Sequence, residues 1–344
     1  MNSESIFPDR PLFIAEISGN HNGSLNRALD LVKAAAEAGA DAVKFQTYTA
    51  STMTLDLPQF SVSNDHPLWG GRTLYSLYEQ AHTPWEWHEE LFNLCRKLNV
   101  LPFSSPFDLS AVEFLEKLDA PMYKIASLET SDLRLIKSVA NTGKPLIIST
   151  GATQWEEIEE VVETVNAAGN DNLTLLLCTS SYPAEPKDAH VRRMQKLRDS
   201  FNVKVGISDH TLGLGVSIAA IARGATVVEK HFTLSRNDEG ADSAFSMEPS
   251  EFSSLVKEGL AAFESLGNEE WSMQPSEMES RRLRRSLFIA ENVRAGEMVS
   301  FQNVRSIRPG HGLNAKYQES IQGMVFNRDF VVGTPLSLDM LDEK

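Results

Sequence analysis

Cysteine is scarce in this sequence of 344 residues. Cys95 lies in a segment with helical periodicity and Cys178 ends an apolar run, so the two cysteines do not indicate a disulfide framework. The first residues, MNSESIFPDRP, also lack the apolar core of a secretory signal peptide. Both observations lead us to expect a protein of the reducing cytoplasm.

Long apolar runs and an excess of positive charge are also missing. No stretch approaches the roughly 18 apolar residues that a membrane-spanning helix needs, so we expect no contact with a membrane. The formal net charge is -15, whereas proteins that bind nucleic acid neutralise its phosphates with clustered lysine and arginine. We therefore expect no nucleic-acid partner, and local positive charge must bind any anionic substrate.

The chain is longer than an average domain, and its length suits one barrel of about 250 residues with a smaller module. Eight short apolar runs alternate with eight segments of helical periodicity. The predicted strands are residues 11–17, 42–46, 100–103, 122–126, 146–149, 173–178, 203–207 and 226–228. The predicted helices are residues 25–38, 84–98, 109–118, 132–140, 155–168, a segment after Pro186, 215–222 and 249–266. An open doubly wound sheet usually has fewer strands, so this count predicts an α/β fold, the closed (β/α)8 TIM barrel.

The character of the chain changes after Leu266. Residues 1–266 form the predicted catalytic barrel, and residues 267–284 are a polar linker that ends in a basic run. Residues 285–344 have short apolar runs broken by glycine and proline, which predicts a small β-rich domain. This domain is suited to binding, to dimerisation or to acting as a lid.

Polar residues follow the predicted strands at their carboxyl ends, which form the active-site rim of a TIM barrel. Helix capping explains some of the serines and threonines. It does not explain Glu16, Lys44, Lys124 and Lys230, because a charge near the barrel interior is unfavourable unless it is paired. We interpret the lysines and hydroxyls as a phosphate site, to which the segment 149–151 would donate backbone N–H groups.

His210 and His231 end two neighbouring predicted strands, so both imidazoles should lie at one mouth of the barrel. This arrangement predicts a two-histidine metal site. Asp209 and Glu229 would accept hydrogen bonds from the imidazoles or contact bound water. The alternative is that each histidine is a hydrogen-bonded loop or core residue.

Residues 47–83 form the longest predicted loop, and they contain five aromatic residues. A loop of this length within a compact domain is usually functional. The aromatic side chains therefore either cover a substrate or form a small satellite core beneath the loop. They are Tyr48, Phe60, Trp69, Tyr75 and Tyr78.

Short motifs over nearly the whole chain carry a family resemblance. They are AEISGNHNG from Ala15, VKFQTY from Val43, FSSPFD from Phe103, YKIAS from Tyr123, ISTGA from Ile148, CTSSYP from Cys178, GISDHT from Gly206, EKHF from Glu229, DSAFSMEP from Asp242, RRSL from Arg284 and RPGHGL from Arg308. In this order they resemble the sialic acid synthase family. The long-loop letters LWGGRTLYSLYEQAHTPWEWH are most similar to its pseudaminic acid synthase branch.

The resemblance implies a barrel followed by an antifreeze-like (SAF) domain, and a condensation of phosphoenolpyruvate with an N-acetylated amino sugar. For the pseudaminic branch this sugar is 2,4-diacetamido-2,4,6-trideoxy-L-altrose. His210 and His231 would hold a divalent cation, Mn²⁺ or Mg²⁺. The residues implied to bind phosphoenolpyruvate are Lys44, Lys124, Ser127, Ser149 and Ser208.

The resemblance also implies residues for the sugar. Glu16, Gln46, Tyr182 and Asp242 match positions that contact it, and Glu129 matches a residue that handles protons and positions water. Glu16, Glu129 and the two histidines would thus be catalytic. Arg308 would act on the barrel of the other subunit in a domain-swapped homodimer.

Other functions remain open at this level. An N-acetylneuraminate or legionaminate synthase would share the motifs but differ in the sugar. A metal-dependent pyruvate aldolase would lack the phosphorylated substrate, although the lysines and hydroxyls favour a phosphate. A carbohydrate-binding or scaffold protein would keep the barrel without catalysis, although unneeded buried charge is destabilising.

Overall fold

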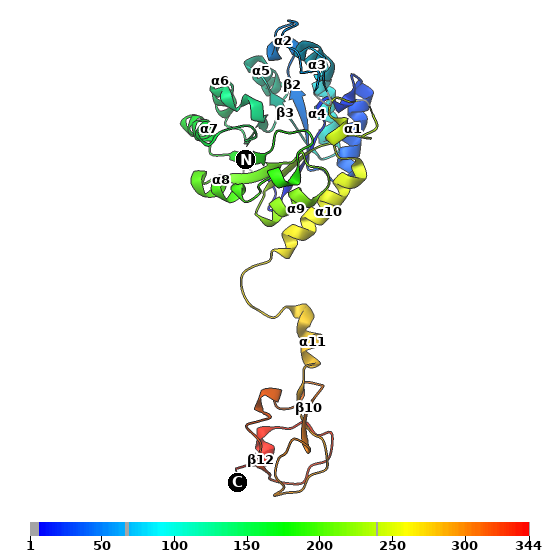
Figure 1. The fold of residues 1–344 in the computed structure, drawn as a ribbon, viewed down its shortest axis with the longest axis vertical. Helices are drawn as coiled ribbons and strands as arrows, with labels where there is room; N and C mark the ends of the chain where they lie inside the picture. Colours follow the sequence, from blue (N-terminus) through cyan, green and yellow to red (C-terminus); the bar gives the residue numbers. More distant parts are fainter. Residues whose placement is uncertain (1–6, 66–68, 239, 344) are drawn as a thin grey trace. The chain divides into compact units, whose positions relative to one another are not determined.

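The structure, a computed structural model, describes residues 7–65, 69–238 and 240–343. The first six residues of the predicted barrel domain, residues 66–68 of the long loop, Glu239 and the last residue of the predicted β-rich domain lie outside them. The chain divides after Gly267 into two units, and each is described by itself (Figure 1).

The first unit is a closed barrel of eight parallel strands, which confirms the predicted TIM barrel. Strand β1 pairs with β2 and also with β8, and this second pairing closes the sheet. The strands are β1 (Leu12–Glu16), β2 (Ala42–Thr47), β3 (Leu101–Pro106), β4 (Tyr123–Ile125), β5 (Leu146–Ser149), β6 (Leu173–Cys178), β7 (Lys204–Ser208) and β8 (Val227–His231).

Helices lie around the outside of the strands, as Figure 1 shows. Eight of them follow the strands as predicted, and their ends differ from the predicted ends by a few residues. These helices are α1 (Leu25–Glu37), α4 (His88–Lys97), α5 (Leu109–Lys117), α6 (Leu133–Ala140), α7 (Trp155–Ala167), α8 (Arg193–Phe201), α9 (Gly215–Ala222) and α10 (Pro249–Ser265). None of the described helices combines the length and the apolar character needed to cross a bilayer.

Polar side chains start several of these helices. Ser24 accepts a hydrogen bond from the backbone N–H of Arg27 at the start of α1. Asp108 accepts from Ser110 and Ala111 at the start of α5. Each of these side chains satisfies an N–H that has no partner within its helix, which favours the start of a helix at that residue.

Strand alternation decides which side chains face the barrel interior. Leu12 and Ile14 of β1 pack in an apolar cluster inside the barrel, so Glu16, two residues further along, also faces inward at the rim. The same alternation places Lys44 above Ala42, Lys124 above Met122, and Glu229 above Val227. The apolar layer therefore supports a charged layer at the carboxyl end of the strands.

The long segment between β2 and α4 was predicted to be a loop, but the structure shows that it contains two short helices. They are α2 (Ala50–Met53) and α3 (Leu74–Ala81). The side chain of Thr49 accepts from Thr52 N–H at the start of α2, and Thr73 accepts from Ser76 N–H at the start of α3. These local caps make helices possible in segments too short to show a clear helical period.

The second unit contains two small antiparallel sheets. Strands β9 (Ser286–Ile289) and β10 (Val304–Ile307) form one, and β11 (Val325–Phe326) and β12 (Leu341–Asp342) form the other. A short helix, α11 (Met278–Arg282), precedes them within the predicted linker. The short apolar runs seen in the sequence pack into a core of their own. This core contains Leu287, Ile289, Val293, Val299, Val304, Ile321, Phe326, Phe330, Leu336 and Leu341.

Candidate active site

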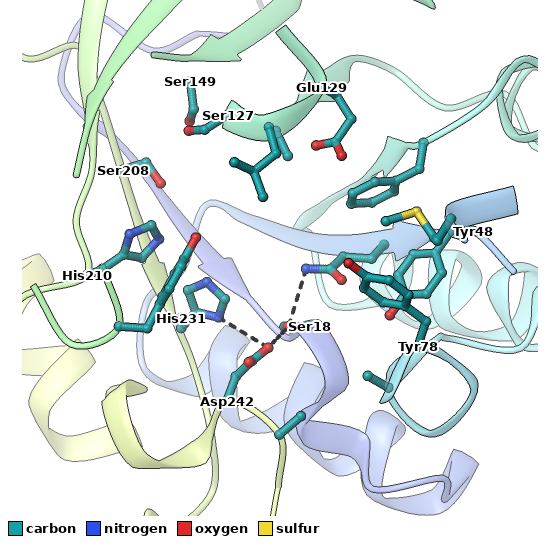
Figure 2. Close-up of a pocket in the computed structure, with 18 of the residues that line it drawn as sticks. Ser18, Tyr48, Tyr78, Ser127, Glu129, Ser149, Ser208, His210, His231 and Asp242 are labelled. Atoms are coloured by element: carbon teal, nitrogen blue, oxygen red, sulfur yellow. Dashed lines mark hydrogen bonds and ion pairs between the residues drawn. The ribbon is translucent and has the colours of Figure 1, made fainter. Parts of the chain in front are cut away.

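A cavity of about 290 Å³ lies at the carboxyl end of the barrel strands. Figure 2 shows polar side chains from several strands pointing into it. The structure thus brings most of the predicted site residues together. Those that line the cavity are Lys44, Gln46, Lys124, Ser127, Glu129, Ser149, Tyr182, Ser208, His210, His231 and Asp242.

The charged side chains on and beside the floor of this cavity form a chain of alternating sign. Lys44 Nζ lies 2.8 Å from Glu16 Oε2 and 3.2 Å from Glu229 Oε1. Lys124 Nζ donates to both oxygens of Glu229, at 2.7 and 2.8 Å. All four side chains are buried. Each buried charge therefore has an opposite charge beside it, which is the condition for placing lysines near the barrel interior.

Burial and pairing shift the pKa values of these groups in different directions. Burial acts to raise the pKa of Glu229, but Lys124 and Lys44 outweigh it and hold that pKa well below its usual range. Burial raises the pKa of Glu16 despite the opposing effect of Lys44. Burial also lowers the pKa of Lys124 to about 8, against the effect of Glu229. Two lysines at one end of the cavity supply positive charge that an anionic ligand could contact.

Three serines add hydrogen-bonding groups above this floor. Gly151 N–H donates to Ser127 Oγ at 3.0 Å, which fixes this hydroxyl at the edge of the cavity. A Cβ atom at Gly151 would lie 2.9 Å from Ser127 Oγ, closer than real Cβ contacts, so this approach requires glycine. Ser208 Oγ donates to Glu229 at 3.1 Å. Ser149 Oγ is buried and has no hydrogen-bond partner among the described residues.

The two histidines face each other with ring centroids 5.3 Å apart. His210 Nδ1 donates to the Thr179 carbonyl at 2.9 Å, which leaves Nε2 without that proton when the ring is neutral. His231 Nδ1 is buried without a hydrogen-bond partner and lies 3.9 Å from Asp242 Oδ2. Two imidazoles with free nitrogens and a neighbouring carboxylate suit a divalent cation.

The histidines differ in how readily they take up a proton. Burial lowers the pKa of His231 well below its usual range, and the neighbouring His210 lowers it further. Burial acts to lower the pKa of His210, but Cys178 and the Thr179 carbonyl outweigh it and raise that pKa. A cation would compete with a proton at His210 more than at His231. Among the described residues, no group of three or more His, Cys, Asp or Glu side chains is arranged to hold a metal ion.

The prediction that Asp209 and Glu229 accept hydrogen bonds from the imidazoles is wrong. Asp209 accepts from Thr211 and Ser217, and Glu229 binds the two lysines and Ser208. The Thr179 carbonyl orients His210 instead. A backbone carbonyl performs the same task as a carboxylate, but it leaves no signal in the residue types.

The prediction that Lys230 joins the rim is also wrong. Its Nζ lies 3.2 Å from Asp209 Oδ2 and donates to the Thr211 carbonyl at 2.5 Å, away from the cavity. Glu229 and His231 face the interior, so Lys230 between them faces the surrounding helices. Its charge is satisfied there, and Lys230 does not line the cavity.

Two predicted residues are not among those that line the cavity. Glu16 lies beside the floor, where its Oε1 accepts from Gln46 Nε2 at 3.0 Å. Its carboxylate thus holds Gln46 and Lys44, both of which do reach the cavity. Arg308 belongs to the second unit, and its action on another subunit stays a prediction.

Sequence reasoning assigned no role to Asn20, which holds the loop that carries Asp242. Asn20 is fully buried, and its Nδ2 donates to the Phe232 carbonyl and to Ser246 Oγ, both at 2.9 Å. Ser243 Oγ donates to Asn20 Oδ1 at 3.2 Å. Asn20 is part of the family motif AEISGNHNG, which could have drawn attention to it. Only the fold shows which groups Asn20 contacts.

Glu129 lies in the turn after β4 and lines the same cavity. Burial raises its pKa to about 7. A carboxyl with this pKa exchanges a proton near neutral pH, which is the property that a general acid or base needs. Cys178 also lines the cavity, with its Sγ 3.9 Å from His210 Nδ1.

Comparisons with known proteins show which sequences and folds this chain is similar to. The chain is 42% identical to a pseudaminic acid synthase of Helicobacter pylori, with 96% of this chain and 98% of that protein covered. It is 35% identical to an N,N'-diacetyllegionaminic acid synthase of Campylobacter jejuni, with 93% and 97% covered. Its fold is similar to the crystal structure of an N-acetylneuraminic acid synthetase from Leptospira borgpetersenii in complex with citrate, with a TM-score of 0.71, 31% identity, and 79% of this chain and 90% of that chain covered.

The model of one protein family, described as the NeuB family, matches residues 31–271. This match covers most of the barrel and more than half of the chain. Together with the identity to the synthases above, it shows that the chain belongs to the NeuB family, the family of the sialic acid synthases.

Proposed function

We propose that this protein condenses phosphoenolpyruvate with 2,4-diacetamido-2,4,6-trideoxy-L-altrose to give pseudaminic acid and phosphate. The observation that carries this proposal is one cavity in which paired lysines and serine hydroxyls lie beside two histidines. The identity to the Helicobacter pylori pseudaminic acid synthase, which extends over nearly the full length of both chains, supports the choice of sugar.

Phosphoenolpyruvate would bind over the charged floor. Lys44 and Lys124 supply positive charge, and Ser127, Ser149 and Ser208 supply hydroxyl groups around them. Ser149 Oγ has no partner among the described residues, so a phosphate or carboxylate oxygen would satisfy it. Donors held in place before the substrate arrives stabilise charge without reorganising during the reaction.

His210 and His231 would hold the divalent cation, Mn²⁺ or Mg²⁺. When bound, such a cation acts as a Lewis acid on a carbonyl oxygen, here the aldehyde oxygen of the sugar. Tyr182, whose ring centroid lies 4.4 Å from that of His210, limits the space beside the histidines. Asp242, next to His231, would contact the sugar.

The chemistry joins carbon 3 of phosphoenolpyruvate to the aldehyde carbon of the sugar, whose oxygen becomes a hydroxyl group. Water then adds to carbon 2, and the bond from carbon 2 to the phosphate oxygen breaks. Glu129 would take the proton from that water, since its pKa is near 7. The remaining rate enhancement would come from holding the two substrates in reacting orientation.

We also propose that residues 285–344 are an antifreeze-like (SAF) domain. In the proposed homodimer, Arg308 of one subunit would act on the barrel of the other. The basis is the resemblance of the RPGHGL segment, together with the separate β-rich unit that this segment belongs to.

Phosphate release measured with three sugars tests the proposed function. We expect kcat/KM for the diacetamido trideoxy sugar to exceed that for N-acetylmannosamine by about tenfold to a hundredfold. The legionaminic acid precursor, which differs in stereochemistry, is the closer competitor. Equal or better turnover of N-acetylmannosamine would overturn the choice of sugar. Condensation of pyruvate without phosphate release would instead indicate an aldolase.

A further inference from the structure

The cavity has a second face that is apolar, built mainly by the segment between β2 and α4. Figure 2 shows Tyr48 and Tyr78 across the cavity from His210 and His231. Four further side chains that line the cavity belong to this face. The apolar face is defined here as Tyr48, Met53, Leu74, Leu77, Tyr78 and Phe107.

These side chains are not part of the core that stabilises the barrel. Within the described residues, none of the six belongs to the apolar clusters between strands and helices or inside the barrel. They pack on one another instead, since the ring of Tyr48 lies edge-on to those of Tyr78 and Phe107, at 5.8 and 5.1 Å. An apolar surface that remains open to a cavity is available to a ligand.

The apolar face has few hydrogen-bonding groups of its own. Its polar atoms in side chains are the hydroxyls of Tyr48 and Tyr78 and the sulfur of Met53. Burial raises the pKa of both tyrosines, so both hydroxyls stay protonated. This face can therefore take methyl groups and an occasional polar atom, but it cannot satisfy several hydroxyl groups of a ligand.

We infer that the apolar face is the subsite for the far end of the sugar, and that it decides which sugar is used. This inference rests on the proposed function, in which the aldehyde at carbon 1 lies at the two histidines. Carbon 6 is at the opposite end of the sugar chain, so its methyl group and the acetamido methyl at carbon 4 reach the opposite face. N-acetylmannosamine would bring hydroxyl groups to the same place, where they lose water without gaining partners.

Leu74 and Met53 are suitable positions for a test. Leu74 is half-buried at the start of α3, and its backbone N–H donates to the Phe60 carbonyl at 2.8 Å, a bond that does not involve the side chain. Met53 is the last residue of α2. Leu55, in the same segment, is 62% exposed and does not line the cavity, so Leu55→Asn is a matched control for Leu74→Asn.

The experiment measures kcat/KM for both sugars by phosphate release in the wild type, Leu74→Asn, Met53→Gln and Leu55→Asn. We expect the preference for the diacetamido trideoxy sugar to fall by about tenfold in each cavity variant and to stay unchanged in the control. KM for phosphoenolpyruvate should remain within about twofold, because its site lies over the charged floor. Thermal unfolding confirms that the variants are folded.

An equal loss for both sugars in folded cavity variants, or an unchanged preference, overturns the subsite. A different result, measured on the wild type, would contradict the proposed function. If the wild type releases no phosphate with the diacetamido trideoxy sugar, the proposed function is overturned, and the subsite is overturned with it. If the wild type uses this sugar but the preference does not change, only the subsite is overturned.

Discussion

The two faces of the cavity differ in how they are built and in what they can do. The polar face, which consists of the charged and hydroxyl side chains that line the cavity, is formed mainly by the barrel strands and the turns that follow them. Its charges are buried and paired, as with Lys124 and Glu229. Most side chains of the apolar face belong to the short helices α2 and α3, in the segment between β2 and α4, and they lie outside the barrel core. Rigid strands hold groups in fixed positions, whereas loops vary easily. This difference is the basis on which we propose that the polar face carries the chemistry and that the apolar face selects the sugar.

Loss of the two histidines should have the largest effect. In the double variant His210→Ala, His231→Ala, or after exhaustive chelation, we expect phosphate release to fall by more than about a hundredfold, because the protein would no longer hold the proposed cation, which would act as a Lewis acid on the sugar aldehyde. The fold should persist, since the barrel core does not depend on this site. Full turnover after chelation would show that the reaction needs no metal ion at the two histidines. The polar face would then differ from the apolar face only in its paired charges and hydroxyl groups.

Glu229→Gln should show how strongly the polar face depends on charge pairing. It leaves Lys124 and Lys44 with less opposing charge in a buried position, so we expect a loss of about 3 to 5 kcal/mol in the free energy of unfolding. Urea denaturation measures this loss. Glu116→Gln is a control at a more exposed pair, because the side chains of Lys144 and Glu116 are 23% and 40% exposed, so water screens their attraction more than on the floor and the pair should contribute less, about 1 kcal/mol.

A loss at Glu229 no larger than that at Glu116 would contradict the buried-pair interpretation. It would mean that water reaches the floor and screens its charges. In that case the two faces would differ in polarity, but the charged side chains of the polar face would not depend strongly on one another for stability.

Glu129 should cause the smallest of these effects, a pH dependence of the rate. Burial raises its pKa to about 7, so the carboxylate is lost as the pH falls below 7. If it acts as a base, kcat should decrease by about tenfold per pH unit below about pH 6, and Glu129→Gln should lack this decrease. A pH profile of phosphate release tests this expectation. The same acidic decrease in Glu129→Gln would assign it to another group.

The same pKa shift predicts an effect on stability with a definite sign. A carboxyl whose folded-state pKa is raised contributes stability below its unfolded-state pKa of about 4.5, and this stability is lost as the pH rises through 7. Glu129→Gln should therefore unfold at a higher urea concentration than the wild type at pH 8. Removing a catalytic group from an unfavourable buried position commonly makes a protein more stable but less active.

Much of the barrel could be predicted because its information is local. Alternating apolar runs and helical periods indicated eight strand–helix units, and caps such as Asp108 mark where helices begin. The position of Glu16 and Lys44 in predicted strands led us to expect both near the barrel interior, where they are buried. Lys230 was misplaced because strand β8 extends through His231, beyond the predicted end, so Lys230 falls on the outward side of the alternation.

The sequence by itself determined the repeating barrel pattern, the family motifs and the inward charges at the strand ends. Only the tertiary structure decided which charges pair, that Thr179 rather than a carboxylate orients His210, and that Tyr48 and Tyr78 face the histidines across a cavity. The physical reason is distance along the chain. Lys124 and Glu229 are separated by 105 residues, and no local period links them until the closed sheet brings their strands to one rim.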